Sequence, residues 1–261
     1  MVKLQMNTEK IENTFQIVGP KNKFPKVTLV DPTNSGYLLF ALEIDRRPPI
    51  GFFIESQLKK KILSKLKSDV VNLRNNSKIL DATVFKAIII PPGRGAFLKN
   101  RPSIEIAKFD VVMLIEFDTH ESAKEFQESL EWQNMKETYK LEPKKTLTVT
   151  GVNVRRIGSV DHSKKGVFLF NYFYADQVKQ NLQVWEYTAG WFQDQTGLDN
   201  STLILPDQVN ESSYKIINHC RWDHLIDILP SLIFKKSFKE FVLNNFEANN
   251  VAAMPILYRL A

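Results

Sequence analysis

The sequence predicts an α+β fold made of two consecutive βαββαβ units. Two observations support this prediction: strand-like and helix-like segments follow one another twice in the same order, and both faces of predicted strands are apolar. The 261 residues, 43% of them hydrophobic and 25% charged, are enough for two fused small units with a substantial core. We place an N-terminal extension at residues 1–35, the first unit at 36–158 and the second at 159–261.

The first unit follows from its hydrophobic periodicity. An apolar stripe at intervals of three to five residues predicts its first helix and consists of Phe53, Leu58, Ile62, Leu66, Val70 and Leu73. Strands are expected at 37–44, 78–90, 108–117 and 146–156. Asp118 can cap the second helix, which follows the third strand. The order is therefore β, α, β, β, α, β.

The second unit repeats that order. Its strands are expected at 167–174, 201–205, 214–222 and 254–260, and its helices at 178–196 and 232–245. Two local matches indicate a duplication. Phe117-Asp118 corresponds to Trp222-Asp223, and the segment SAKEF at 122–126 corresponds to SFKEF at 237–241. The second match requires an insertion after Asp223, for which residues 225–233 are available.

The exposed face of each sheet predicts how the two units pack. In a ferredoxin-like βαββαβ unit, both helices cover one face of an antiparallel sheet, and the other face needs a cover. The strand at 167–174 is apolar on both faces, because Phe168, Phe170 and Tyr172 alternate with other apolar side chains. The simplest cover is the sheet of the other unit. Two tandem ferredoxin-like units packed as a pseudodimeric α/β barrel are therefore expected.

The segment FDVVMLIEFD at 109–118, followed by Glu125-Phe126, resembles the dimeric α/β-barrel superfamily, in particular its antibiotic-biosynthesis-monooxygenase and EthD-type members. The resemblance implies a tandem single-chain pseudodimer with small-molecule pockets between sheet and helices. Members of that superfamily include cofactor-free oxygenases, haem-binding and haem-degrading enzymes, isomerases and proteins without known activity. Membership of the fold alone therefore fixes no reaction.

Composition excludes several classes of function. The net charge of +6 arises from 35 basic and 29 acidic residues that are interspersed, so no nucleic-acid partner is expected. No apolar run reaches the ~18 residues that span a bilayer, and no signal peptide is recognisable, so we expect a cytoplasmic protein without a membrane partner. Cys220 is the only cysteine and the four histidines lack metal-ligand spacing, so no metal site is expected. A homodimer is left open.

Aromatic residues in the second unit predict a substrate pocket. Trp185, Tyr187, Trp191 and Trp222, together with the amide of Asn218, are the expected binding residues for a small organic ligand. Aromatic rings with a few polar groups suit a flat molecule. The alternative is that these rings only fill the core between helix and sheet.

A polar cluster is the candidate for catalysis. His219 and Arg221 share one face of the strand at 214–222, and Glu116 occupies the position in the first unit that matches Arg221. In a pseudosymmetric barrel these three side chains can meet, and a histidine near a carboxylate can move a proton near neutral pH. The alternative is an ion-pair network with a purely structural role.

The resemblance implies a small-molecule enzyme that carries out cofactor-independent oxidation or isomerisation of an aromatic or polyketide-like substrate. The alternative is a non-catalytic ligand-binding or interaction protein with a filled barrel. Haem bound through His219 or His224 is a less favoured option, because the tryptophan and histidine spacing of haem-degrading members is absent, and no cofactor is expected. An enclosed cavity touching His219 and Arg221 favours the enzyme, whereas a packed interior favours the alternative.

Overall fold

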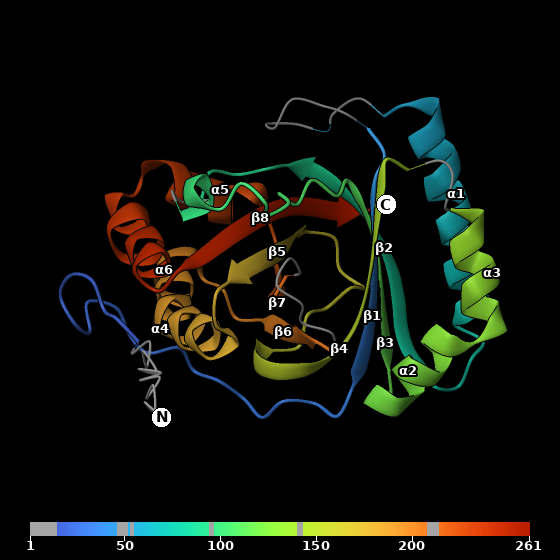
Figure 1. The fold of residues 1–261 in the computed structure, drawn as a ribbon, viewed down its shortest axis with the longest axis horizontal. Coiled ribbons are helices and arrows are strands. Elements are labelled where there is room, and N and C mark those ends of the chain that lie inside the picture. The colour runs from blue at the N-terminus through green and yellow to red at the C-terminus, as the bar shows by residue number, and fades with distance from the viewer. Residues whose placement is uncertain (1–14, 46–51, 53–54, 94–96, 140–142, 208–213) are drawn as a thin grey trace, which may run out of the picture.

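The computed structural model describes residues 15–45, 52, 55–93, 97–139, 143–207 and 214–261, and eight of its strands form a closed antiparallel barrel (Figure 1). The strands are β1 Gly36–Glu43, β2 Ile79–Ile89, β3 Val111–Phe117, β4 Lys145–Gly158, β5 Val167–Ala175, β6 Ser201–Pro206, β7 Ile216–Trp222 and β8 Val251–Leu260. The helices are α1 Gln57–Leu73, the 3-10 turn η1 Phe97–Asn100, α2 His120–Glu128, α3 Leu130–Thr138, α4 Val178–Thr196, α5 Leu225–Phe234, the π-helical turn η2 Phe238–Leu243 and α6 Asn244–Ala248.

The barrel consists of two ferredoxin-like sheets joined at their edges. Around the barrel the strands follow the order β1-β3-β2-β8-β5-β7-β6-β4. The first four strands of the chain are therefore ordered β4-β1-β3-β2, and the last four have the equivalent order β8-β5-β7-β6. The edge strand β2 pairs with β8, and β4 pairs with β6, both antiparallel. Closure removes the open edges that a single sheet would present, and it confirms the predicted fold class.

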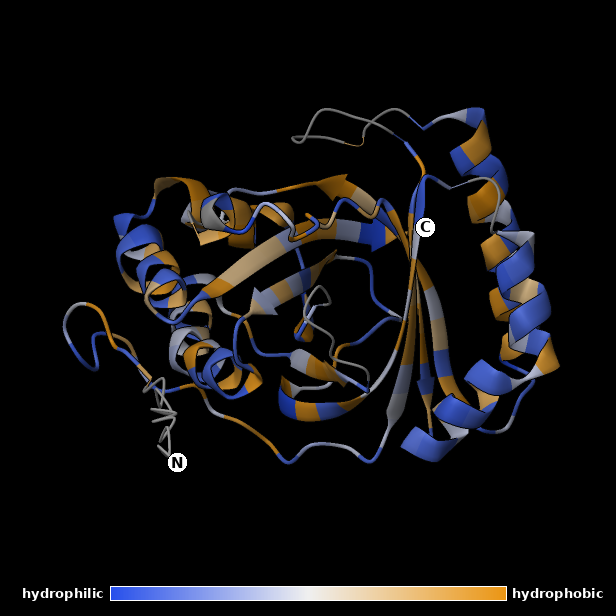
Figure 2. Cartoon of the chain, in the orientation of Figure 1, coloured by the Kyte–Doolittle hydropathy of each residue, from blue (hydrophilic) through white to orange (hydrophobic). Residues whose placement is uncertain are grey.

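Three apolar layers result from this arrangement. Figure 1 shows α1, α2 and α3 on one side of the barrel and α4, α5 and α6 on the opposite side. One layer lies between the first sheet and its helices, and includes Phe40 and Trp132. A second lies between the other sheet and its helices, and includes Trp185. The third fills the inside of the barrel. Figure 2 shows helices banded in orange and blue, as expected for helices with one buried face.

The inside of the barrel is packed with aromatic rings. Phe85, Phe168, Phe170, Tyr172 and Tyr258 expose none of their surface. The ring centroids of Phe85 and Phe170 are 5.2 Å apart, and those of Phe170 and Tyr258 are 5.3 Å apart, both edge to face. These are favourable aromatic geometries in a dense core. The centre of the barrel is therefore a hydrophobic core.

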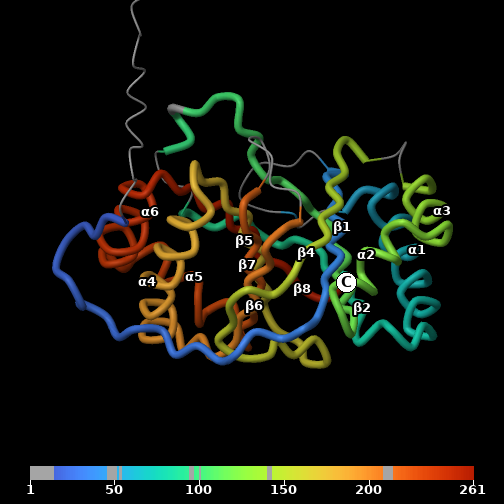
Figure 3. The backbone as a smooth tube through the Cα atoms, turned by 60° about the horizontal axis from the view of Figure 1, so that its bottom comes forward, coloured from blue at the N-terminus to red at the C-terminus, as the bar shows by residue number. Residues whose placement is uncertain are grey.

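The described part of the N-terminal extension crosses the helices of the second half (Figure 3). Two asparagines one helical turn apart hold it there. Asn249 Oδ1 accepts from the backbone N–H of Gln16 at 2.9 Å, and Asn245 Oδ1 accepts from that of Val18 at 2.8 Å. Their amide groups donate in return to the carbonyl oxygens of residues 16 and 18. Residues 16 and 18 are thereby fixed against the last helical region of the chain.

The last helical region differs from the prediction. A single helix was expected at 232–245, but the structure has α5, then η2, then α6. Helix α5 ends before Lys235, whose ψ of 114° is extended. The sequence did not predict a helix at the position of α5, because Pro230 lies inside it and a proline usually indicates that a helix ends. Helix α5 fills the insertion that the repeat alignment required after Asp223.

Candidate ligand site

Strands β5 and β7 direct two amide side chains towards the helices of the second half. Alternation places Leu169, Asn171 and Phe173 of β5 on the face that α4 covers. Asn171 lies directly opposite Asn218 of β7 in the strand register. Both belong to the lining of a cavity below α4. Two amides therefore sit next to each other in an otherwise apolar layer.

Two small adjoining cavities lie between this sheet and its helices, and each leaves about 30 Å³ of free space for water-sized atoms. The residues common to both linings are Leu169, Asn171, Phe192, Trp222 and Phe246. The first cavity extends under α4 to Trp185 and Thr188, and the second extends under α5 to Ile228 and Leu232. Each has room for about one water molecule.

Asn171 is the least satisfied polar group in this lining. Its side chain is buried, with 8% of the residue exposed, and its Oδ1 atom has no hydrogen-bond partner among the described residues. Asn218 differs, because its Oδ1 accepts from the Ser201 hydroxyl at 2.5 Å. An unpaired buried carbonyl oxygen costs about 1–3 kcal/mol. The Asn171 oxygen is therefore a natural acceptor for a donor supplied from the cavity.

Three of the five predicted binding residues line this site. Trp185 and Asn218 belong to the first cavity, and Trp222 borders both. The indole N–H of Trp222 donates to the Thr196 hydroxyl at 3.0 Å, which fixes the ring as part of the wall. The structure thus brings these three side chains together around Asn171, a residue that the sequence analysis did not single out.

The other two predicted binding residues lie elsewhere. Trp191 is fully buried, donates to the Ser237 hydroxyl at 3.0 Å, and lies outside both linings. Tyr187 lines a separate surface groove of about 420 Å³ between α4 and the N-terminal extension. Its ring packs edge to face on Phe15, with centroids 5.8 Å apart. Trp191 therefore fills the core between helix and sheet, which is the alternative role stated for these aromatic rings.

The cavity chemistry is that of binding and orientation. Cys220 is the only titratable side chain among the described lining residues, and burial raises the pKa of its thiol far above the usual range. No described lining residue is therefore suited to take up a proton near neutral pH. The amide groups can hydrogen-bond a carbonyl, a hydroxyl or a developing oxyanion.

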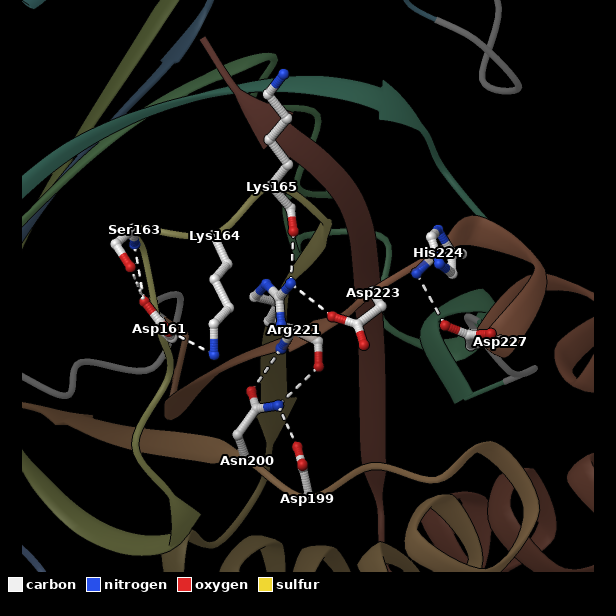
Figure 4. Close-up of polar contacts among 10 residues, drawn as sticks. All are labelled: Asp161, Ser163, Lys164, Lys165, Asp199, Asn200, Arg221, Asp223, His224 and Asp227. Carbon is white, nitrogen blue, oxygen red and sulfur yellow. Dashed lines mark hydrogen bonds and ion pairs between the residues drawn. The ribbon is translucent and has the colours of Figure 1, made fainter.

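The three predicted catalytic residues make contacts with different partners. Glu116 accepts from the Tyr37 hydroxyl at 2.9 Å, at the end of β3. Arg221 lies at the end of β7, where it donates to Asp223 at 2.6 Å and to the carbonyl oxygen of Lys165 (Figure 4). His219 lies in the barrel interior. No hydrogen bond or ion pair between described residues joins any two of the three.

His219, itself buried, is part of a partly buried hydrogen-bonded chain that links both halves. Asp81 of β2 bonds to Nδ1 of His162 at 2.7 Å, and Nε2 of His162 bonds to Nε2 of His219 at 2.8 Å. Nδ1 of His219 lies 3.0 Å from the carbonyl oxygen of Leu169. The ring of His219 also stacks on Phe170, with centroids 4.1 Å apart. Sequence reasoning missed His162 and Asp81, because His162 lies in the linker between the halves, where no periodicity marks it.

The protons on the two Nδ1 atoms of this chain follow from the groups that they face. The Leu169 carbonyl can only accept, so His219 carries a proton on Nδ1. An ionised Asp81 also only accepts, so His162 carries one on its own Nδ1. The two Nε2 atoms, 2.8 Å apart, then face each other across the barrel interior.

Two members of this chain have shifted pKa values. Burial holds the pKa of His219 well below its ordinary value, and the nearby His162 adds to this effect. Burial alone would raise the pKa of Asp81, but His162, the Thr83 hydroxyl and the Arg74 charge together outweigh burial and lower it. His219 is therefore a neutral imidazole at pH 7.

We expect His219 to make folding stability depend on pH. Its folded pKa is depressed, so below pH ~6.5 the unfolded chain binds a proton that the folded chain does not, and stability falls by up to about 1.4 kcal/mol per pH unit. His219→Gln should flatten the slope between pH 7 and pH 5 by that amount. Urea unfolding at several pH values measures it. The exposed His224→Gln serves as a control that keeps the wild-type slope, and an unchanged slope in His219→Gln would contradict the assignment.

Comparison with solved structures reveals the same fold at very low sequence identity. An anthrone oxidase-like protein matches with a TM-score of 0.64 and 8% identity, covering 87% of this chain and 92% of that protein. A protein from Fusobacterium nucleatum subsp. nucleatum, provisionally assigned as a monooxygenase, matches with a TM-score of 0.52 and 7% identity, with the same coverage of 87% and 92%. No family model and no curated protein sequence matches the chain. The fold is that of the dimeric α/β barrels, as predicted.

Haem does not fit His219 as the structure places it. Both imidazole nitrogens of His219 are engaged, and the surrounding aromatic rings leave no space for a porphyrin. His224 is exposed at the beginning of α5. A haem-binding protein from Thermus thermophilus matches with a TM-score of 0.43, 8% identity and 91% coverage of this chain, which is too low to transfer a cofactor.

Proposed function

We propose that this protein is a small-molecule enzyme that binds its substrate between the second sheet and helices α4 to α6. The unpaired Oδ1 of Asn171, enclosed by aromatic walls, is the observation that carries the proposal. The reaction that we propose is a cofactor-independent oxidation or isomerisation. The fold that the chain shares with an anthrone oxidase-like protein supports this reaction class only at the level of architecture.

The walls favour a flat aromatic or polyketide-like compound. Trp185, Phe192, Trp222 and Phe246 contribute ring faces and edges, and Asn171 offers an acceptor for a substrate hydroxyl. Ligand sites usually enclose about 300–1,000 Å³, far more than the present free space. Binding therefore requires the two adjoining cavities to expand and join. Phe192 lines both cavities, so a rotation of its side chain would connect them.

The absence of a proton acceptor among the described lining residues restricts the substrate further. A compound with an acidic position, such as a methylene group flanked by aromatic rings and a carbonyl, can lose a proton to water and form an enolate. An amide N–H of Asn171 or Asn218 would stabilise the enolate oxygen. The enolate can then be reprotonated at another position, which is an isomerisation. Alternatively it reduces O₂, with the balance CH₂ + O₂ → C=O + H₂O.

A specific observation favours a second candidate function. The barrel interior is filled by the aromatic rings around His219, and the described linings of the cavities include neither His219 nor Arg221. A catalytic cluster inside the barrel is therefore not part of our proposal. A non-catalytic ligand-binding or interaction protein remains the alternative, in which the same cavity binds without turnover.

Ligand binding should depend on Asn171. We expect Asn171→Leu to weaken the binding of 1-naphthol or anthrone at least tenfold, which is about 1.4 kcal/mol, because the naphthol hydroxyl loses its acceptor and the anthrone carbonyl loses its amide donor. Quenching of tryptophan fluorescence measures the affinity, since Trp185 and Trp222 line the site. Oxygen uptake or product formation tests turnover in the same samples.

Asn181→Leu is the matched control. Asn181 of α4 is also fully buried and has both side-chain polar atoms unpaired, but it does not line either cavity. Both variants remove unsatisfied polar atoms, so both should keep or gain stability, whereas only Asn171→Leu should lose affinity. Equal losses in the two variants, or no binding of either probe to the wild type, would refute the site. Binding without turnover would support the non-catalytic alternative.

A further inference from the structure

Helix α5 is apolar on two opposite faces, and only one is covered. Ile228 and Leu232 are buried and line the second cavity. On the other face, Ile226 is 75% exposed, Ile233 is 50% exposed and Phe234 is 80% exposed. Ile226 lies seven residues before Ile233 and eight before Phe234, which is about two helical turns. The three side chains therefore share one side of the helix. Single exposed apolar residues are common, but three on one short helix form a patch.

Lysines border this patch. Lys235, Lys236 and Lys239 follow the helix directly, and all three are exposed. Two acidic residues lie near these lysines in the sequence and are outnumbered by them. Asp227 accepts from the backbone N–H of His224 at 2.8 Å, and Glu240 forms an ion pair with Lys23 at 3.9 Å. The surface formed by Ile226, Ile233, Phe234 and the three lysines, here called the α5 surface, therefore presents an apolar centre with a positive rim.

We infer that the α5 surface docks on an anionic lipid membrane. A helix with exposed large apolar side chains and adjacent lysines lies in the interface plane of such a membrane, where the side chains enter the acyl boundary and the lysines meet the headgroups. Among the described residues, no helix has the length and apolar character needed to cross a bilayer.

A second copy of the chain fits the α5 surface less well. A two-fold contact would bring Lys235, Lys236 and Lys239 of both copies towards each other, and like charges across an interface oppose association. A stable dimer also buries about 800 Å² on each partner, and one helix of 10 residues offers much less. An anionic surface satisfies the lysines and needs no such area.

The position of α5 gives membrane docking a consequence for the site. Ile228 and Leu232 form the wall of the second cavity, on the reverse side of the α5 surface. A docked α5 would place that wall directly against lipid. If the proposed function holds, an apolar substrate could pass from the bilayer into the cavity when α5 shifts.

Vesicle sedimentation with the full-length chain tests the inference. We expect binding to vesicles of 30% phosphatidylserine in phosphatidylcholine, and at least tenfold weaker binding to phosphatidylcholine alone. Ile233→Ser with Phe234→Ser should lower the affinity at least tenfold. Lys236→Gln with Lys239→Gln should lower it severalfold and reduce its dependence on salt. Lys235 is left intact, because its amine donates to the carbonyl oxygen of Gln195.

Matched controls lie on the opposite side of the barrel. Leu130 of α3 is 75% exposed, so Leu130→Ser removes a comparable apolar group and should leave vesicle binding unchanged. Absence of wild-type binding to anionic vesicles, or an equal effect of Leu130→Ser, would overturn the inference. A dimer in solution that Phe234→Ser dissociates would assign the surface to a second copy instead. Asn171→Leu should still bind vesicles, so failure of the ligand site and failure of docking remain distinguishable.

Discussion

Replacement of His219 by alanine is expected to lower the free energy of unfolding by about 3–5 kcal/mol, as the loss of a buried aromatic side chain does. The ring exposes only 1% of its surface and stacks between the phenyl rings that fill the barrel. Its removal also leaves Nε2 of His162 and the Leu169 carbonyl without their present partner. Urea denaturation at pH 7, followed by tryptophan fluorescence, measures the loss.

The same variant decides between a structural and a catalytic role for His219. His219→Ala should bind anthrone with unchanged affinity at temperatures where it is folded, because His219 does not line the cavities. His224→Ala, at an exposed position, should change stability by no more than about 0.5 kcal/mol. Wild-type stability of His219→Ala combined with lost turnover would restore the catalytic role that the sequence suggested.

Strand periodicity was sufficient to predict the barrel. The segment at 167–174 has an apolar side chain at nearly every position, and only a strand covered on both faces needs that pattern. In the structure, Phe168, Phe170 and Tyr172 face the barrel interior and Leu169 and Phe173 face the helices. The boundaries at 35/36 and 158/159 stay predictions, because the two sheets share one closed barrel.

The sequence predicted the candidate site only in part, and the reason differs from residue to residue. Trp185, Asn218 and Trp222 were found because aromatic residues cluster near one strand. Asn171 was missed inside an apolar strand, although a polar residue on the helix-facing side was a usable signal. Glu116, His219 and Arg221 share a face in the pseudosymmetric alignment, but strand position alone cannot determine which side chains touch. Their actual partners come from loops and neighbouring strands.

The α5 surface shows a different limit of sequence reasoning. No membrane partner was expected, because no apolar run is long enough to span a bilayer, but a surface contact needs no such run. The segment LIDILPSLIF looks like ordinary core, and hydropathy does not reveal which of its apolar side chains are covered. Only the packing of Ile228 and Leu232 against the sheet leaves Ile233 and Phe234 in solvent.

A buried ion pair in the first half provides the second large expected effect. Lys59 of α1 and Asp110, next to β3, have side chains that are 1% and 0% exposed, and their charged atoms are 3.1 Å apart. Asp110 also accepts from the backbone N–H groups of Ile44 at 2.7 Å and Asp45 at 3.3 Å. Burial raises the pKa of Asp110, which Lys59 and these N–H groups partly oppose. The pair ties α1 to the ends of β1 and β3.

Lys59→Met should lower the free energy of unfolding by about 3–5 kcal/mol, because it leaves the Asp110 charge buried without a counter-ion. The double variant with Asp110→Asn removes that charge and keeps an oxygen for the Ile44 N–H, so it should be more stable than Lys59→Met alone. Urea unfolding of the wild type, both single variants and the double variant closes the cycle. Additive losses would show that the two side chains are not coupled. Ligand affinity should be unchanged throughout, since the pair lies in the half of the barrel that does not contain the cavities.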